Sequence, residues 1–212
     1  LLPRSDLIEM NKHFTGKLKE IENDIQISLR KYQAVREWNQ LLTEGISYLS
    51  SAFDSVKPKI KIIKIPKYKV VTAKFILDTD QGYSDYNDVI INKHIVNTSE
   101  KYNLYCAGPV FLIYDNYVER IGETFKEIKI YVPIYNESFL PELIVNFGDV
   151  KAVSTIHIGK YSDINLTYLR LVKWCYENNI VLQGSAIEKY LIDPWSTDNE
   201  QNYVTRIFLP II

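Results

Sequence analysis

Glu188 is the residue with the clearest chemical potential in this sequence. It lies within Ala186–Leu191, a run of aliphatic and aromatic residues typical of a buried strand. Because an unpartnered carboxylate is costly to bury, its position predicts either a ligand site or an ion pair. Tyr190 shares its face of the strand, since side chains alternate along a strand. The residues alone also allow a Glu188 that faces solvent or pairs with Arg206 or Lys189.

Other reactive side chains form no recognisable site. The histidines, His13, His94 and His157, are far apart and have no second ligand at metal-binding spacing. The sequence contains no GxSxG motif, no P-loop and no glycine-rich dinucleotide motif. Cys106 and Cys175 form no CxxC pair and suit buried thiols in a reducing compartment. We therefore expect neither a metal ion nor a cofactor.

The charge balance excludes strong nucleic-acid binding by this chain alone. Its formal net charge is −1, which provides no basic field for phosphates. No apolar run approaches the length of a membrane span, so we expect a cytoplasmic protein. The sequence opens at Leu1 and its only methionine is Met10, which suggests a missing upstream part. Any DNA contact is expected to come from that absent N-terminal domain.

The chain after residue 57 contains two copies of one pattern. Gly108 and Pro133 bound the hairpin of the first copy, and Gly184 and Pro210 bound that of the second at almost the same separation. A strand and a helix precede each hairpin, over 68–77 and 84–100 in the first copy and over 152–159 and 163–178 in the second. In the second helix, an apolar stripe is expected to face the core: Leu166, Leu169, Val172 and Tyr176.

This pattern predicts an α+β fold in which two βαββ repeats, 57–135 and 150–212, form one antiparallel-sheet domain over 57–212. The repeats are expected to be related by a pseudo-twofold axis. A single helix covers only one face of a three-stranded sheet, so the copies must pair. We expect a concavity where they meet.

The N-terminal residues show heptad spacing over roughly five heptads. This spacing predicts a long coiled-coil dimerisation helix over 1–52 and therefore a homodimer. A single amphipathic helix packed on its own domain is the alternative. The seam residues are Leu7, Phe14, Leu18, Ile21, Ile25, Tyr32, Val35 and Leu42.

Comparison of the two copies sharpens the choice of ligand-binding residues. Leu112 is the first-copy counterpart of Glu188, and an acid where the sister copy holds leucine indicates a purpose other than packing. Tyr114 is likewise the counterpart of Tyr190. Tyrosine rings stack on flat ligands and attract cations through their faces. Phe111 and Trp195 complete this set of candidates.

At this point the sequence resembles a known family, the GyrI-like or AraC-type effector-binding domain of MerR-family transcription regulators. The resemblance covers about 57–212, and the preceding heptad helix is similar to the MerR-family dimerisation helix. Four segments carry it, in this order and spacing: Ile156–Tyr161, Ile187–Tyr190, Asp193–Trp195 and Tyr203–Pro210.

The resemblance implies a function and adds two site residues. It implies that Glu188 lies at the base of a pocket for cationic aromatic compounds and that Tyr161 and Tyr203 line this pocket. We therefore expect the effector-sensing and dimerisation part of a transcription regulator. A GyrI-like hydrolase that uses the cavity glutamate and a protein-binding inhibitor module are the alternatives. The heptad helix favours the regulator over both.

Overall fold

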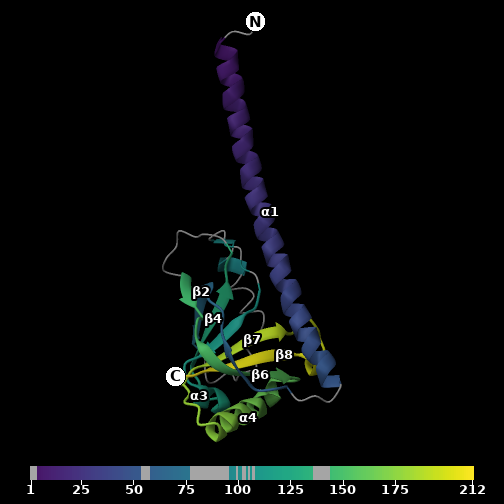
Figure 1. The fold of residues 1–212 in the computed structure, drawn as a ribbon, viewed down its shortest axis with the longest axis vertical. Coiled ribbons are helices and arrows are strands. Elements are labelled where there is room, and N and C mark those ends of the chain that lie inside the picture. Colours follow the sequence, from purple (N-terminus) through teal and green to yellow (C-terminus); the bar gives the residue numbers. More distant parts are fainter. Residues whose placement is uncertain are drawn as a thin grey trace.

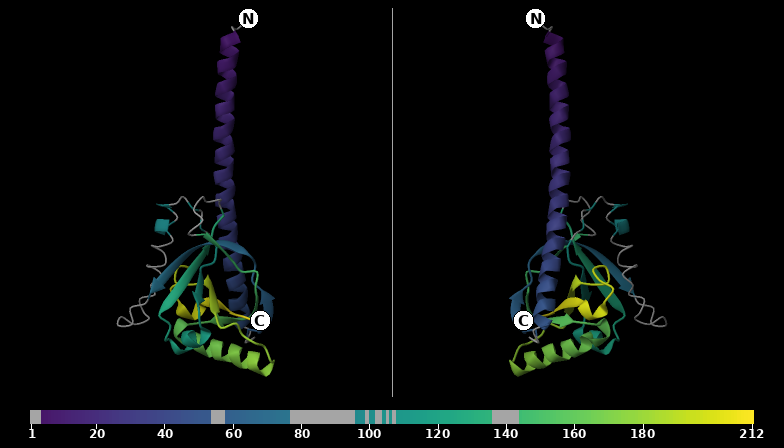
Figure 2. Two further views of the ribbon diagram at one scale, coloured as in Figure 1. Left: turned by 90° about the vertical axis from the view of Figure 1, so that its left-hand side faces the viewer. Right: turned by 90° about the vertical axis from the view of Figure 1, so that its right-hand side faces the viewer.

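The computed structural model describes residues 4–53, 58–76, 96–98, 100–101, 104, 106, 108–135 and 144–212. Helix α1 (Arg4–Phe53) is continuous over 50 residues, and most of it projects beyond the strands (Figures 1 and 2). At 1.5 Å per residue it is about 75 Å long. Its heptad seam is exposed to solvent, and Ile25 near its middle is 52% exposed.

The rest of the described chain forms one antiparallel sheet of eight strands in the order β1-β6-β8-β7-β3-β4-β2-β5. This arrangement confirms the predicted α+β fold. The strands are β1 (Lys61–Lys64), β2 (Tyr68–Ile76), β3 (Phe111–Tyr114), β4 (Glu127–Pro133), β5 (Ile144–Phe147), β6 (Lys151–Ile158), β7 (Ala186–Ile192) and β8 (Val204–Pro210). Helices α3 (Tyr117–Gly122) and α4 (Ile164–Glu177) pack against it.

The sheet has the pseudo-twofold symmetry that the repeat predicts. Strands β6, β8 and β7 of one half correspond to β2, β4 and β3 of the other. The central pair is β3 and β7, where Leu112 lies directly opposite Glu188. Phe111 faces Lys189 and Ile113 faces Ile187 on either side of that pair. The two equivalent positions are therefore cross-strand neighbours at the symmetry axis.

The two edge strands are exchanged between the halves. β1 precedes β2 in the chain but pairs with β6, whereas β5 precedes β6 but pairs with β2. The connections therefore cross, and the N–H groups of Ile65 and Asp149 donate to the carbonyls of Val150 and Ile65 at 2.9 Å each. β5 lies ahead of position 150, where the second repeat is expected to begin. The expected limits 1–52 and 57–212 stay predictions.

One face of the sheet is covered by α3 and α4. The side chains that α4 buries there are Ile164, Tyr168, Leu171 and Cys175. The predicted stripe was therefore wrong, since Leu166, Leu169 and Tyr176 are all more than half exposed. Both sets fit the period of a helix, and helical spacing alone does not say which one faces the sheet. The first-copy helix expected over 84–100 lies mostly outside the described residues.

The C-terminal part of α1 packs on the opposite face, against β7 and β8. Leu41 is buried there with Leu191 and Val204. Gly45 lets the helix approach closely, because a Cβ atom at this position would meet Ile192 Cγ1 at 2.6 Å. Strands β7 and β8 are thus covered by α4 on one face and by α1 on the other (Figure 1).

We expect Gly148→Ala to destabilise the protein strongly. Gly148 has φ +93°, and an added Cβ would lie 1.9 Å from the Pro66 carbonyl oxygen, where the two connections cross. Gly184→Ala is the matched control, because Gly184 has φ +108° but no atom within 4 Å of an added Cβ. The control should lose about 1–3 kcal/mol from backbone strain alone. Gly148→Ala should lose about 1–3 kcal/mol more from overpacking. Equal losses in denaturant unfolding would contradict the close crossing.

Candidate functional site

Glu188 is buried at the centre of the sheet with no exposed surface. Strand β7 places its side chain on the same face as Ile207 of β8, which lies directly opposite it. That face is covered by α3 and α4. Lys189 and Arg206 lie on the other face and pair with Glu44 of α1 at 3.1 and 2.6 Å. Neither of the two ion pairs considered for Glu188 from the sequence is formed.

Three donors satisfy the Glu188 carboxylate. Arg120 of α3 donates from Nε to Oε1 at 2.7 Å, and the Tyr168 hydroxyl of α4 donates to the same oxygen at 2.9 Å. The Tyr190 hydroxyl donates to Oε2 at 2.7 Å. A carboxylate taken out of water needs such partners, and an arginine with two phenols provides both charge and hydrogen bonds.

The Arg120 guanidinium lies inside an aromatic cage. Its central carbon is 5.0 Å from the ring centre of Tyr114, 5.5 Å from that of Tyr168 and 5.8 Å from that of Phe125. These distances are within the range of cation–π attraction. Nη1 also donates to Asn165 Oδ1 at 3.3 Å. The cage and the Glu188 carboxylate together surround one planar cation. We call this arrangement of Glu188, Tyr114, Tyr168 and Phe125 the cation seat.

The protonation states in this cluster follow from burial and charge. Burial is the largest single effect and disfavours the charged guanidinium, but the Glu188 carboxylate and the surrounding tyrosines together favour it more strongly, so the pKa of Arg120 is raised above its ordinary value. Burial, reinforced by the negative charge of Glu188, also holds the pKa values of Tyr168 and Tyr190 well above the ordinary tyrosine value. Both phenols therefore stay protonated and act as donors.

Two further predicted residues extend the aromatic cluster. Tyr161 contacts Tyr190 edge to face with ring centres 5.5 Å apart, and it stacks on Tyr203 at 5.0 Å. Tyr203 is buried, and Tyr161 is partly buried at the start of the segment that leads into α4. The cluster thus continues from Glu188 through Tyr190 to Tyr161 and Tyr203.

The other two predicted site residues lie elsewhere. Phe111 points to the opposite face of the sheet, where its ring packs against Tyr68 and Phe147 at 5.3 and 5.0 Å. Trp195 lies in the turn after β7 and is 44% exposed. Neither contacts the Glu188 cluster in this structure, because strand parity separates Phe111 from it and the turn carries Trp195 away.

The sequence analysis missed the two residues that bind Glu188 from the helices. Tyr168 belongs to the buried stripe of α4, which a correct choice of helix face would have found. Arg120 is 68 positions away from Glu188 along the chain. It lies in a six-residue helix that shows no periodic signal. Its only sequence clue is a basic residue in a turn rich in acids.

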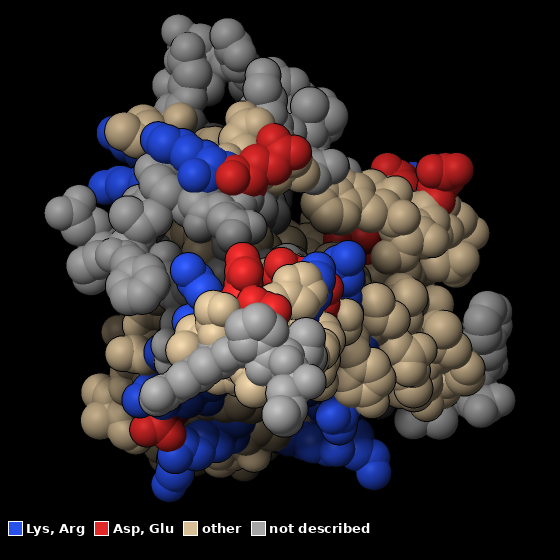
Figure 3. All heavy atoms as spheres, turned by 90° about the horizontal axis from the view of Figure 1, so that it is seen from above, with Lys and Arg blue, Asp and Glu red and all other residues tan. Residues whose placement is uncertain are grey.

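Other kinds of site find no support in the part of the chain that the structure describes. There, no three potential ligands come together for a metal ion, and no helix could span a membrane. Acidic and basic side chains are mixed on the face seen from the N-terminal end of α1 (Figure 3).

His157 Nε2 lies 2.8 Å from the Lys160 carbonyl and Nδ1 lies 2.9 Å from the Thr167 hydroxyl. Burial lowers the pKa of His157, consistent with a neutral, structural imidazole.

A double-mutant cycle tests the buried pair. Arg120→Met or Glu188→Gln alone should cost about 3–5 kcal/mol of unfolding free energy, because each strands a buried charge. The double variant should lose clearly less than the sum of the two, as measured by denaturant unfolding. Lys129→Met, which removes a partly exposed pair with Asp115, should cost under about 1 kcal/mol. Additive losses at Arg120 and Glu188 would show that the two side chains do not interact.

The profile of the GyrI-like small molecule binding domain family matches residues 145–212. No curated protein sequence matches the chain significantly. The crystal structure of the EcmrR C-terminal domain is similar, with 20% identity and a TM-score of 0.59 over 73% of this chain and 98% of that one. EcmrR in a cryo-EM complex with DNA shares 15% identity and a TM-score of 0.57 over 99% and 77%.

A hydrolase from Listeria innocua shares 14% identity and a TM-score of 0.52 over 76% of this chain and 96% of that one. At these identities the solved structures establish the fold alone. The match over residues 145–212 includes Glu188, Tyr190 and Tyr203. Residues 145–212 are therefore similar in sequence to the GyrI-like small molecule binding domain family, and both halves of the sheet share the fold of the EcmrR C-terminal domain.

Proposed function

We propose that this chain is the effector-sensing and dimerisation part of a MerR-type transcription regulator, and that its effector is a lipophilic or aromatic cation. The observation that carries the proposal is the seat at Glu188, where a fully buried carboxylate and three aromatic rings surround a guanidinium. This combination stabilises a cation through charge and through aromatic faces at once. Tyr190, Tyr161 and Tyr203 extend the same wall.

Arg120 occupies the seat in this conformation, so an effector must exchange with it. Such an exchange keeps Glu188 paired with a cation before and after binding. Binding then avoids the large cost of leaving a buried carboxylate alone. Arg120 itself would move into solvent, where its charge is well hydrated. The proposed effector thus competes with a side chain of the protein, and its apparent affinity depends on that competition.

The element that carries Arg120 is short. α3 is six residues long, and its Val118 is 59% exposed. Besides the Glu188 pair and the aromatic rings around Arg120, it is anchored by the Tyr117 N–H to the Gly184 carbonyl at 2.7 Å and by Asn165, which bonds Arg120 at 3.3 Å and Glu123 at 2.9 Å. In the proposed exchange, these are the contacts of α3 that the effector would replace or rearrange.

Strand β7 offers a route from the seat to α1. Glu188 faces α3 and α4, and its neighbour Lys189 pairs with Glu44 of α1 on the other face. A shift of β7 on effector binding would therefore move the attachment of the proposed dimerisation helix. Coupling of this kind requires two arrangements that the effector binds unequally. DNA contact in the whole regulator would come from a domain outside this chain.

We expect tetraphenylphosphonium, a lipophilic aromatic cation, to bind the Arg120→Met variant about tenfold or more tightly than the unmodified chain, because the competing cation is gone. The Arg120→Met/Glu188→Gln variant should lose this gain, since no carboxylate remains. Titration calorimetry gives the three affinities. Triphenylphosphine oxide, which is neutral, serves as the ligand control and should bind all three proteins alike.

Equal cation affinity in the single and double variants would place the cation elsewhere and refute the role of Glu188. Thermal melts of each variant show whether the protein is folded during the titration. The double variant is informative here, because it removes both charges together and leaves neither one stranded. Mass spectrometry of the recovered cation would reveal any turnover, which would favour the hydrolase alternative.

Dimerisation through α1 predicts that Ile25→Glu converts a dimer into a monomer. Ile25 lies in the middle of the seam and is half exposed in the single chain. Asn23→Glu is the control, because two residues correspond to roughly 200° around the helix. Analytical ultracentrifugation should give twice the chain mass for the unmodified protein and the control. A monomeric unmodified protein would refute the dimer and would favour the alternative of a single amphipathic helix that packs on its own domain.

A further inference from the structure

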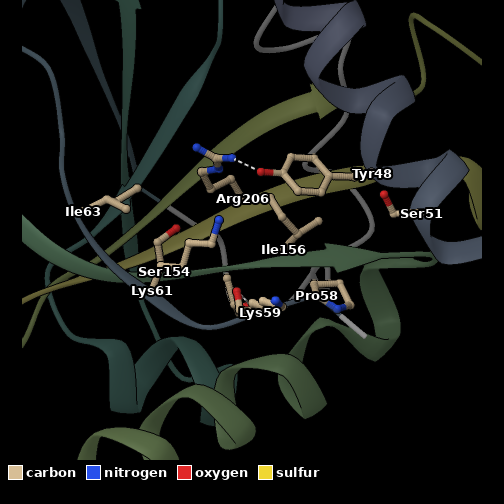
Figure 4. A pocket seen from close by; sticks show the side chains of 10 residues that line it. Tyr48, Ser51, Pro58, Lys59, Lys61, Ile63, Ser154, Ile156 and Arg206 are labelled. Carbon is tan, nitrogen blue, oxygen red and sulfur yellow. Dashed lines mark hydrogen bonds between the residues drawn. The ribbon is translucent and has the colours of Figure 1, made fainter. Parts of the chain in front are cut away.

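A cavity lies on the opposite face of the sheet from Glu188. It has a volume of about 400 Å³ and is enclosed by the last turns of α1, the edge strand β1 and strands β6 and β8 (Figure 4). Arg206 lines it, and the adjacent residue Ile207 is the one that lies opposite Glu188. Because successive side chains point to opposite faces, the cavity and the Glu188 seat are separated by the sheet itself.

Strand register brings cations to this cavity in a defined pattern. Lys61 of β1 lies directly opposite Ser154 of β6, and Ile156 lies directly opposite Arg206 of β8. These four side chains share one face, so both cations border the same hollow. Figure 4 shows the Lys61 amine turned into the cavity on the side of Arg206. Lys59 adds a third cation to the lining.

The positive charge of the lining is only partly neutralised. Arg206 pairs with Glu44 at 2.6 Å and donates to the Tyr48 hydroxyl. Among the described residues, Lys59 and Lys61 have no carboxylate partner, and no acidic residue lines the cavity. Positive charges that converge on a concave surface raise the local concentration of anions.

The Ser154 hydroxyl is a second, independent indication of a ligand. Ser154 is 4% exposed, yet within the described part of the chain its hydroxyl makes no hydrogen bond. Its oxygen is not sealed in the core and is open to a partner from outside the protein. Its open side is the cavity, where the side chain lies beside Lys61 (Figure 4). A ligand oxygen placed there would satisfy it.

Much of the remaining lining is apolar. Ile63, Ile156 and Pro58 line the cavity together with the ring of Tyr48. A bare inorganic ion would leave these walls without contacts, whereas an anion attached to a small apolar group would use both kinds of surface. Tyr48 and Ser51 come from α1 and the other lining residues come from the strands and the segment before them. An occupant would therefore link the dimerisation helix to the sheet.

We propose that this cavity is a second ligand site, which binds a small organic anion through an oxyanion group held by Lys61, Ser154 and Arg206. Its occupant stabilises the attachment of α1 to the domain. The site is distinct from the cation seat in both chemistry and position. It does not depend on the function proposed for Glu188.

Phenyl phosphate is a suitable probe. Its binding can be followed through the backbone amide chemical shifts of the full chain during a titration. We expect saturable shifts at residues 59–63 and 154–156. Lys61→Met should weaken binding about tenfold and Ser154→Ala by a smaller factor. Lys173→Met is the matched control, because Lys173 is an exposed lysine of α4 outside the cavity. It should bind like the unmodified chain.

Equal weakening by Lys61→Met and Lys173→Met would show diffuse attraction and overturn the proposal, as would shifts that never saturate. Inorganic phosphate should bind more weakly than phenyl phosphate, since it leaves the apolar walls empty, and equal binding would refute their role. Arg120→Met/Glu188→Gln should still bind phenyl phosphate in this cavity, with shifts at the same residues, because neither side chain lines it. Failure of cation binding at Glu188 would therefore leave this result untouched, and the reverse also holds.

Discussion

The buried ion pair between Glu188 and Arg120 is the interaction on which the domain depends. Glu188 lies at the symmetry axis of the sheet, where the sister copy places Leu112 and a packed core would place another apolar residue. Keeping a carboxylate there requires a cation and two phenols from three separate elements. These partners fix α3 and α4 against β7. The partners of one unfavourable residue thus join the helical layer to the sheet, beside the apolar side chains that α4 buries there.

The duplication accounts for much of the fold, and the difference between Leu112 and Glu188 at equivalent positions accounts for the site. Exchanged edge strands and crossing connections lock the halves together, so the axis is a rigid place at which to position a charge. A perfectly symmetric domain would carry leucine or glutamate at both positions. Two carboxylates would repel each other, and two leucines would form an ordinary core. A single acid at the axis is the arrangement that can hold one cation.

The sequence predicted the strands well because period-two alternation and paired Gly and Pro positions are local signals. It also identified Glu188 as a carboxylate that needs partners, since an acidic residue inside a strand-like run can be recognised without a structure. Arg120 was missed because its partner is 68 positions away and no local pattern connects them. The face of α4 was misjudged because two stripes fit the helical period. Tyr168 faces the sheet and Leu166 faces solvent. Which of the two stripes is buried depends on tertiary packing, which the sequence pattern does not contain.

Consecutive residues of β7 connect the two faces of the domain. Glu188 binds the helical layer and Lys189 binds Glu44 of α1, while Arg206 joins the same glutamate from β8. β7 cannot slide or rotate at Glu188 without displacing Lys189, because the two residues are adjacent in the strand and their side chains point to opposite faces. A ligand that shifted β7 on replacing the partners of Glu188 would therefore also displace the contacts of Lys189 at the base of α1. The alternation of a single strand places the buried carboxylate and the contacts of a helix about 75 Å long on neighbouring residues.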